Sequence, residues 1–187
     1  MSIAQNKADA RKVAFAARKV AFETGLDEAA NRNLIGQLAL YRDAEIIAAY
    51  MPIRTEVSPR ATMTILHGQE KRICVPVIQG AGLPLKFQEW TPDAEMLNGP
   101  FGASVPASGE FLQPDVLITP LLSFDRKGYR LGYGGGFYDR SFAELSALKP
   151  VIGVGFAYSA QQVKRVPTEP TDYKLNAIVT EIDVIRF

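Results

Sequence analysis

The segment 123–140, SFDRKGYRLGYGGGFYDR, constrains the fold more than any other stretch of the chain, because five glycines fall within residues 128–136. Glycine adopts backbone angles that are closed to other residues, and it lets a ligand approach the main chain closely. The apolar run DVLIT at 115–119 precedes the segment and has the length of a buried strand, and a helical pattern follows at 137–148. A glycine-rich loop between a strand and a helix is typical of α/β folds.

The rest of the chain alternates in the same way between apolar runs of strand length and stretches of helical pattern. We expect helices at 3–24, 27–41, near 59–67 and at 137–148, strands at 45–50, 73–78, 115–119, 151–156 and finally 177–180, a glycine-rich loop at 125–136, and short edge strands with loops over 80–110. This order predicts an α/β fold, a single three-layer domain over residues 1–187 with a mostly parallel central sheet and helices on both faces. Ligands bind such sheets beyond the carboxyl ends of the strands.

Composition and charge narrow the class of protein. With 47% apolar and 22% charged residues, the 187-residue chain is expected to be ordered. The 21 basic and 20 acidic residues leave a net charge of +1, which argues against a nucleic-acid partner. The single cysteine, Cys74, excludes an intramolecular disulfide framework and suits a reducing compartment. No apolar run approaches the about 18–20 residues of a membrane-spanning helix, so we expect a cytoplasmic protein without a membrane partner.

The glycine-rich loop is a candidate phosphate site. The free amides and the dipole of the following helix N-terminus would hold phosphate oxygens, and Arg126, Lys127, Arg130 and Arg140 add positive charge. The loop matches neither common nucleotide-binding motif. A Walker A loop needs Gly-Lys followed by Ser or Thr, which the loop lacks, and Phe137 stands where the dinucleotide-binding pattern needs its third glycine. Phosphate binding is favoured over a plain connecting turn.

Two aspartates have two interpretations each. Asp139, just inside the helix after the loop, either complements the helix dipole or holds Mg²⁺ beside phosphates. Asp172, in a loop before the strand at 177–180, is either a turn former or a second acidic metal group. The spacing alone does not choose between these roles.

A stripe of cations is expected on the N-terminal helix. Lys7, Arg11 and Arg18 fall within an arc of roughly 40° at about 3.6 residues per turn. Such a stripe suits an anion such as a triphosphate, and the alternative is a solvated helix face.

Other reactive side chains offer less. Glu56 follows the strand at 45–50 and could accept hydrogen bonds from a pterin-like ring, although a surface position is the alternative. His67 is expected at a helix end and Cys74 inside a buried strand, which favours a capping residue and an inert thiol. Phe87 and Trp90 are expected to pack, and the alternative is that they line a pocket for an aromatic ligand.

The segment 124–140, FDRKGYRLGYGGGFYDR, resembles the signature of the 5-formyltetrahydrofolate cyclo-ligase family nearly throughout. Supporting matches are Lys7 with Arg11, residues 50–56, the Gly-x-Phe-Gly at 99–102 with Pro106, and residues 166–181, so the resemblance covers nearly the whole chain. It implies a single α/β domain. It also implies ring closure of 5-formyltetrahydrofolate to 5,10-methenyltetrahydrofolate with ATP and Mg²⁺, through phosphorylation of the formyl oxygen and attack by N10, with release of ADP and phosphate.

The resemblance also implies the site residues. Arg130 and Asp139 would be catalytic, and Asp139 and Asp172 would serve Mg²⁺. ATP would bind Lys7, Arg11, Arg130, Leu131, Gly132, Tyr133, Gly134, Gly135, Gly136, Phe137 and Tyr138. The folate would bind Met51, Glu56, Tyr133, Gly134, Gly135, Gly136 and Phe137.

Three positions depart from the family pattern. Phe137 replaces a common tyrosine, Gly135 stands where some members have lysine, and Asn176 often aligns with aspartate. Two alternative functions are a non-catalytic relative that binds folate or nucleotide, and a sugar-phosphate enzyme on a similar fold. We expect ATP and 5-formyltetrahydrofolate as ligands and a monomeric protein.

Overall fold

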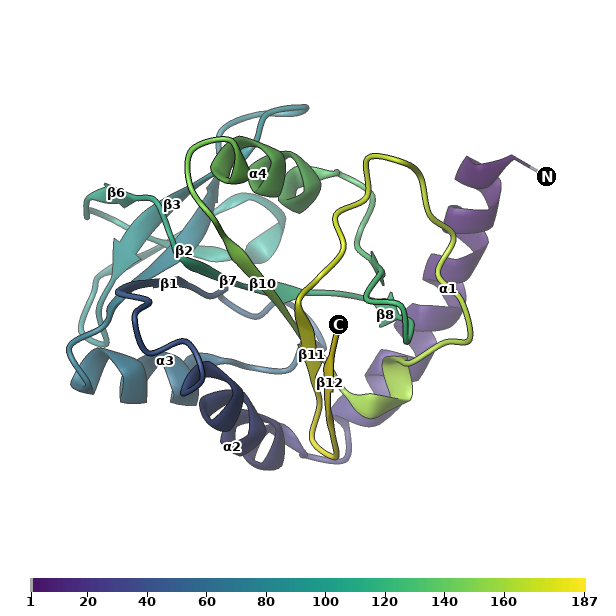
Figure 1. Ribbon diagram of the computed structural model, residues 1–187, viewed down its shortest axis with the longest axis horizontal. Coiled ribbons are helices and arrows are strands. Elements are labelled where there is room, and N and C mark those ends of the chain that lie inside the picture. The colour runs from purple at the N-terminus through teal and green to yellow at the C-terminus, as the bar shows by residue number, and fades with distance from the viewer. Residues whose placement is uncertain (1) are drawn as a thin grey trace.

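The predicted strand segments pair into one central sheet in the computed structural model, which describes residues 2–187 (Figure 1). Its strands are β1 (Ile46–Ala48), β2 (Arg72–Ile78), β3 (Leu85–Trp90), β6 (Phe111–Leu112), β7 (Val116–Pro120), β10 (Ile152–Phe156), β11 (Ala177–Val179) and β12 (Val184–Arg186). Their order is β12-β11-β10-β7-β1-β2-β3-β6. The pairings from β11 to β2 are parallel, whereas β12, β3 and β6 pair antiparallel at the two sides. The predicted mostly parallel sheet is confirmed.

Helices cover both faces of the sheet, as predicted. The helices are α1 (Ile3–Phe22), α2 (Asp27–Leu38), α3 (Arg60–Gly68) and α4 (Phe137–Ser146). In Figure 1, α4 lies above the sheet and α2 and α3 lie below it. Side chains of successive strand residues point to opposite faces of the sheet. Val116 and Ile118 therefore pack in the core between the sheet and helices α2 and α3, while Leu117 packs in the core between the sheet and α4.

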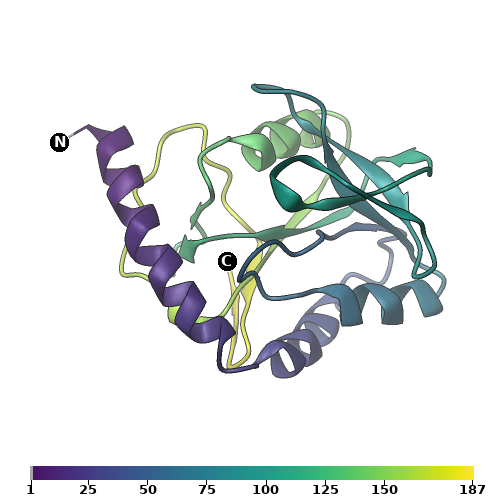
Figure 2. The same cartoon turned by 180° about the vertical axis from the view of Figure 1, so that it is seen from behind.

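The remaining helix, α1, stands at one end of the molecule, as Figures 1 and 2 both show. It packs against η2 (Ser159–Gln161), the 3₁₀ turn that follows β10. Its buried alanines, Ala14 and Ala21, let it approach the rest of the fold closely. The helix therefore lies beside the region beyond the carboxyl ends of the parallel strands. Within residues 2–187, no helix combines the length and apolar character that crossing a membrane requires.

Three expectations from the sequence were wrong in detail, and they concern the last strand, the segment 80–110 and the glycine-rich loop. The strand at 177–179 is not the final one, because a turn between Thr180 and Asp183 brings β12 back beside β11. Three-residue β12 is too short to show an alternating pattern in the sequence.

The segment 80–110 contains more regular structure than predicted. β3 pairs with β2 along its whole length and lies inside the sheet, since β6 pairs on its other side. A separate hairpin joins β4 (Met96–Asn98) to β5 (Ser104–Pro106) around η1 (Pro100–Gly102). The glycine-rich loop also begins with a hairpin of β8 (Ser123–Phe124) and β9 (Arg130–Leu131). Short polar strands of this kind carry little periodic signal.

Candidate active site

A cavity of about 790 Å³ opens beyond the carboxyl ends of the parallel strands. Met51 follows β1, Ile78 ends β2 and Pro120 ends β7, and all three line the cavity. This volume lies in the range of roughly 300–1,000 Å³ that is usual for small-molecule sites. The position agrees with the sequence expectation for a mostly parallel sheet.

The structure gathers the sequence-predicted site residues around this one cavity. Its lining includes all of them: Lys7, Arg11, Met51, Glu56, Arg130, Leu131, Gly132, Tyr133, Gly134, Gly135, Gly136, Phe137, Tyr138, Asp139 and Asp172. They come from α1, the loop after β1, the glycine-rich loop, α4 and the loop before β11. Segments far apart in the sequence therefore meet at one site.

The glycine-rich loop packs against the Arg11 side chain of α1. Gly134 has φ +105°, and a Cβ there would lie 3.0 Å from the guanidinium carbon of Arg11. Arg11 Nε also donates a hydrogen bond to the Gly132 carbonyl at 2.9 Å. Gly136, at φ +64°, is the N-cap of α4, and no side chain within residues 2–187 caps that helix. Amides of its first turn can therefore bind an anion.

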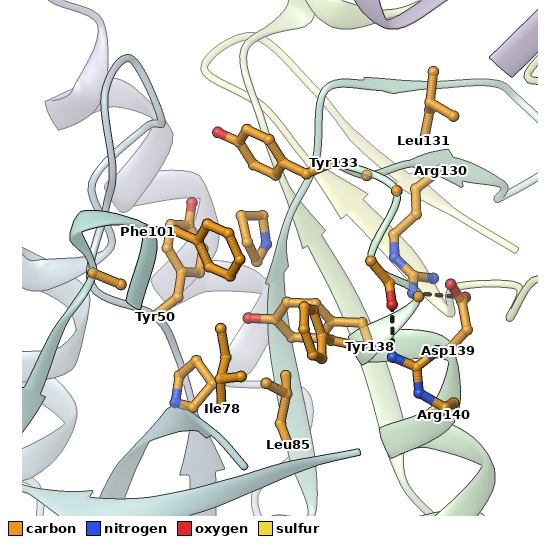
Figure 3. Close-up of a pocket in the computed structure, with 18 of the residues that line it drawn as sticks. Tyr50, Ile78, Leu85, Phe101, Arg130, Leu131, Tyr133, Tyr138, Asp139 and Arg140 are labelled. Carbon is orange, nitrogen blue, oxygen red and sulfur yellow. Dashed lines mark hydrogen bonds and ion pairs between the residues drawn. The ribbon is translucent and has the colours of Figure 1, made fainter. Parts of the chain in front are cut away.

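Arg130 and Asp139 form an ion pair at this helix start. Arg130 is buried, and its Nη2 donates to Asp139 Oδ1 at 2.8 Å (Figure 3). The Tyr173 N–H also donates to Asp139 Oδ1, and Arg130 Nη1 donates to the Tyr173 carbonyl. Asp139 thus lies in the first turn of α4 but bonds to another loop rather than to its own helix. Among residues 2–187, none donates a hydrogen bond to Asp139 Oδ2.

Lys7 lies between two carboxylates. Its Nζ is 2.7 Å from Glu169 Oε2 and 2.8 Å from Asp172 Oδ2, and its side chain is 12% exposed. Partial burial disfavours the ammonium ion, but the hydrogen bonds to Asp172 and Glu169 outweigh this and raise the pKa of Lys7. Asp172 also accepts from the Glu169 N–H, which fits the turn-forming role. The solvated-face alternative is wrong for Lys7.

Arg18 does not join Lys7 and Arg11 at the cavity lining. It is buried with 1% exposure, and its Nη1 lies 3.5 Å from Glu56 Oε1. Glu56 is equally buried, so the surface alternative for this residue is wrong. Burial raises the pKa of Glu56, while the Ile53 N–H and the Arg18 charge oppose that shift. Burial and the Glu56 charge together raise the pKa of Tyr133 to about 12.

The other end of the cavity is apolar and aromatic. Figure 3 shows Tyr50, Ile78, Leu85 and Phe101 on the side opposite Arg130 and Asp139, with Tyr138 between them. The sequence had assigned no role to the first four. The sequence held two signals for them: Ile78 and Leu85 adjoin strand ends on the ligand-binding edge, and Tyr50 and Phe101 lie within segments that match the family. Phe101 is 76% exposed and has φ +60°.

The three departures from the family pattern have distinct surroundings. A Cβ on Gly135 would lie 2.6 Å from the Phe137 ring, so a larger residue requires that ring to move. Phe137 lines the cavity and lies under the Arg140 guanidinium. Asn176 Oδ1 accepts from the Gly153 N–H at 2.8 Å, a structural contact between β10 and the start of β11.

The remaining reactive residues lie outside the cavity lining. Cys74 is fully buried in β2, and burial raises the pKa of its thiol, as expected for an inert cysteine. His67 lies in the last turn of α3, and Phe87 and Trp90 pack in the core. The described residues 2–187 contain no group of three or more His, Cys, Asp and Glu side chains able to hold a metal.

Comparison with known proteins gives a consistent result. A sequence profile of the 5-formyltetrahydrofolate cyclo-ligase family matches residues 4–181. The 5-formyltetrahydrofolate cyclo-ligase of Haemophilus influenzae is 39% identical over 149 residues, which cover 76% of this chain and 77% of that protein. The Escherichia coli K12 protein of the same name is 33% identical over 144 residues, 73% of this chain and 78% of the relative.

Solved structures share the fold. The 5,10-methenyltetrahydrofolate synthetase of Aquifex aeolicus superposes with a TM-score of 0.79 at 30% identity, covering 96% of this chain and 92% of that one. The Mycoplasma pneumoniae synthetase superposes with a TM-score of 0.72 at 26% identity, covering 94% and 98%.

Proposed function

The chain belongs to the 5-formyltetrahydrofolate cyclo-ligase family, and from this premise we propose that the cavity between α1 and α4 is its active site. The activity is ATP-dependent closure of 5-formyltetrahydrofolate to 5,10-methenyltetrahydrofolate, a reaction of folate one-carbon metabolism. One observation carries the assignment of the site: a single cavity has a cationic end beside a helix N-terminus and an apolar, aromatic end beside a buried carboxylate.

ATP is proposed to occupy the cationic end. Lys7, Arg11 and Arg130 supply positive charge, and the loop 130–138 supplies backbone amides next to the start of α4. Phosphate oxygens are bound well by such amides and by the positive end of a helix dipole. Asp172 and Asp139 hold the cations of Lys7 and Arg130 at the cavity wall. These carboxylates thereby fix where the positive charge lies.

The folate is proposed to occupy the apolar end. Met51, Phe101 and Tyr133 offer flat or flexible apolar surface to an aromatic ring, and Glu56 offers a carboxylate to ring N–H groups. The loop residues from Tyr133 to Phe137 line the cavity and are proposed to contact both ligands. The formyl group would then face the γ-phosphate.

The residues present fit a magnesium ion. Mg²⁺ takes oxygen ligands and, in ATP sites, needs only one or two carboxylates besides the phosphates. Asp139 Oδ2 is such an oxygen, with no hydrogen bond from any residue in 2–187. Asp172 remains a second candidate, although both of its oxygens accept hydrogen bonds from Lys7. Held by Asp139, such an ion would neutralise charge on the transferring phosphoryl group.

The proposed chemistry activates a poor electrophile. The formyl oxygen attacks the γ-phosphorus, the bond to the β-phosphate oxygen breaks, and ADP leaves. N10 then attacks the formyl carbon, the carbon–oxygen bond breaks, and phosphate departs with the former formyl oxygen, while N10 loses its proton. Arg130 stabilises charge and the cavity aligns the reacting atoms, so no nucleophilic side chain is needed.

An isotope experiment tests this proposal. With ¹⁸O in the formyl group, each methenyl product formed is expected to release one phosphate that contains ¹⁸O. ADP is expected only when 5-formyltetrahydrofolate is present. Unlabelled phosphate alongside product would refute phosphorylation of the formyl oxygen. Saturable folate binding without ADP would instead indicate a binding protein, and phosphosugar binding without folate affinity would indicate the sugar-phosphate alternative.

Oligomeric state and cellular location remain predictions of a cytoplasmic monomer. The fully buried Cys74 is consistent with a reducing compartment. One of the curated relatives, from Arabidopsis thaliana, is mitochondrial.

A further inference from the structure

Arg18 is a buried cation that the proposed function does not use. It lies on α1 behind the cavity wall and is 1% exposed. Its Nε donates to Thr55 Oγ1 at 3.1 Å and its Nη2 to the Tyr133 hydroxyl at 2.6 Å. The guanidinium carbon also lies 5.4 Å from the centre of the Tyr133 ring. One side chain thus joins α1, the loop after β1 and the glycine-rich loop.

The ion pair between Arg18 and Glu56 is incomplete. Arg18 Nη1 and Glu56 Oε1 are 3.5 Å apart, and neither atom has a hydrogen-bond partner within the described residues 2–187. Glu56 Oε2 accepts the Ile53 N–H at 2.9 Å, so the carboxylate is oriented by one oxygen. Buried polar atoms without partners are unfavourable for stability. Glu56 itself lines the cavity, so the orientation of its carboxylate bears directly on what the apolar end can bind.

We propose that Arg18 is a positioning residue for the folate, which keeps the Glu56 carboxylate and the Tyr133 ring in place at the apolar end of the cavity. This inference rests on the proposed function of that site. It differs from the triphosphate role that the stripe of Lys7, Arg11 and Arg18 predicted, because only the first two line the cavity.

The charges around Glu56 support this role. The Glu56 charge acts on the hydroxyl groups of Tyr50, Tyr133 and Tyr138, where burial followed by that charge raises each pKa. Arg18 is therefore the cation that favours an ionised Glu56 in this surrounding. A carboxylate accepts ring N–H groups at two oxygens, whereas its protonated form accepts less well.

The test separates folate binding from ATP binding. Wild-type turnover is measured first, so that failure of the proposed function is seen before any variant is compared. KM for 5-formyltetrahydrofolate and KM for ATP are then measured for Arg18→Met, Arg18→Lys and Tyr133→Phe. Lys19→Met is the control, because it removes the neighbouring, exposed cation of the same helix. Thermal unfolding of each variant is followed in parallel.

For Arg18→Met we expect KM for the folate to rise at least about 10-fold, the loss of one charge-assisted contact, with KM for ATP changed less than about twofold. Arg18→Lys should recover part of the loss, because it retains the charge but not the forked contacts to Thr55 and Tyr133. Tyr133→Phe should give a smaller rise, and Lys19→Met none.

The pH profile gives a second readout. Without the Arg18 charge, ionisation of Glu56 becomes harder, so the acidic limb of kcat/KM for the folate should move to higher pH in Arg18→Met and less in Arg18→Lys. If Arg18→Met does not fold, Arg18→Lys carries the same comparison. A rise in KM for ATP alone, equal rises for both substrates, or a lower melting temperature with unchanged KM values would each overturn the proposal.

Discussion

At the scale of single residues, three ion pairs lie in or directly behind the cavity lining. Arg130 pairs with Asp139, Lys7 with Asp172, and Arg18 with Glu56. The sequence identified these residue types but not their pairing, since Lys7 and Asp172 are 165 residues apart. It also grouped Arg18 with Lys7 and Arg11, because helical spacing reports a shared face and not what packs against each part of it.

Asp139→Asn tests the metal role at this scale. Asparagine keeps an acceptor for Arg130 and Tyr173 but removes the negative charge. We expect kcat to fall by about 100-fold or more, with a melting temperature close to that of the wild type.

Asp172→Asn, which weakens the ion pair that holds Lys7, should mainly raise KM for ATP. Steady-state turnover over a range of Mg²⁺ concentrations checks both, and near-normal turnover of Asp139→Asn would exclude the role.

Glu56 also predicts a pH dependence of stability. Burial raises its folded pKa above 4.5 despite opposition from the Ile53 N–H and Arg18, so the folded state binds the proton more tightly than the unfolded chain. The contribution of Glu56 to the free energy of unfolding is then largest below pH 4.5 and falls as pH rises through the folded pKa.

The matched measurement compares the wild type with Glu56→Gln by chemical denaturation between about pH 4 and pH 8. The free energy of unfolding of the wild type relative to the variant should decrease with pH and then level. The Arg18 interaction is already part of this pH dependence, because it acts on the ionised carboxylate and opposes the rise of the folded pKa. A difference that stays constant or rises would contradict the raised pKa.

At the scale of elements, the glycine-rich loop links α1 to the start of α4, because Arg11 Nε donates to the Gly132 carbonyl and Gly136 is the N-cap of α4. The sequence predicted a loop between a strand and a helix, and it predicted α1 and α4 to within a few residues. It missed β9 and β12, because strands of two or three residues have no measurable periodicity. It also underestimated β3, whose interior position depends on pairing with β6 rather than on its own residues.

Two glycines of this loop give a matched test. Gly134→Ala places a Cβ at a φ of +105° and 3.0 Å from the Arg11 guanidinium carbon, whereas a Cβ on Gly132 meets nothing within 4 Å. We expect Gly134→Ala to lower the free energy of unfolding by about 1–3 kcal/mol and to raise KM for ATP. Gly132→Ala should change stability less. Equal melting temperatures of the two variants would contradict the strained loop.

At the scale of the whole molecule, the sheet brings the ends of β1, β2 and β7 to one edge, and Lys7 and Arg11 of α1 line the cavity there. The α/β class followed from the alternation of apolar strands and helices. The position of the cavity could be predicted only from the general rule that ligands bind beyond the carboxyl ends of parallel strands. Its lining residues could not all be predicted, because its two ends come from segments separated along nearly the whole chain. Tyr50, Ile78 and Leu85 were missed for that reason: their residue types indicate core positions, and Tyr50 and Leu85 are indeed buried although they line the cavity.

The central claim is that one cavity joins ATP and folate for ring closure. The most direct measurement follows the absorbance of 5,10-methenyltetrahydrofolate during incubation of the protein with 5-formyltetrahydrofolate, ATP and Mg²⁺, each omitted in turn. Product that forms only when all three are present is the predicted result. Folded protein that binds 5-formyltetrahydrofolate but forms no product with all three present would contradict the account.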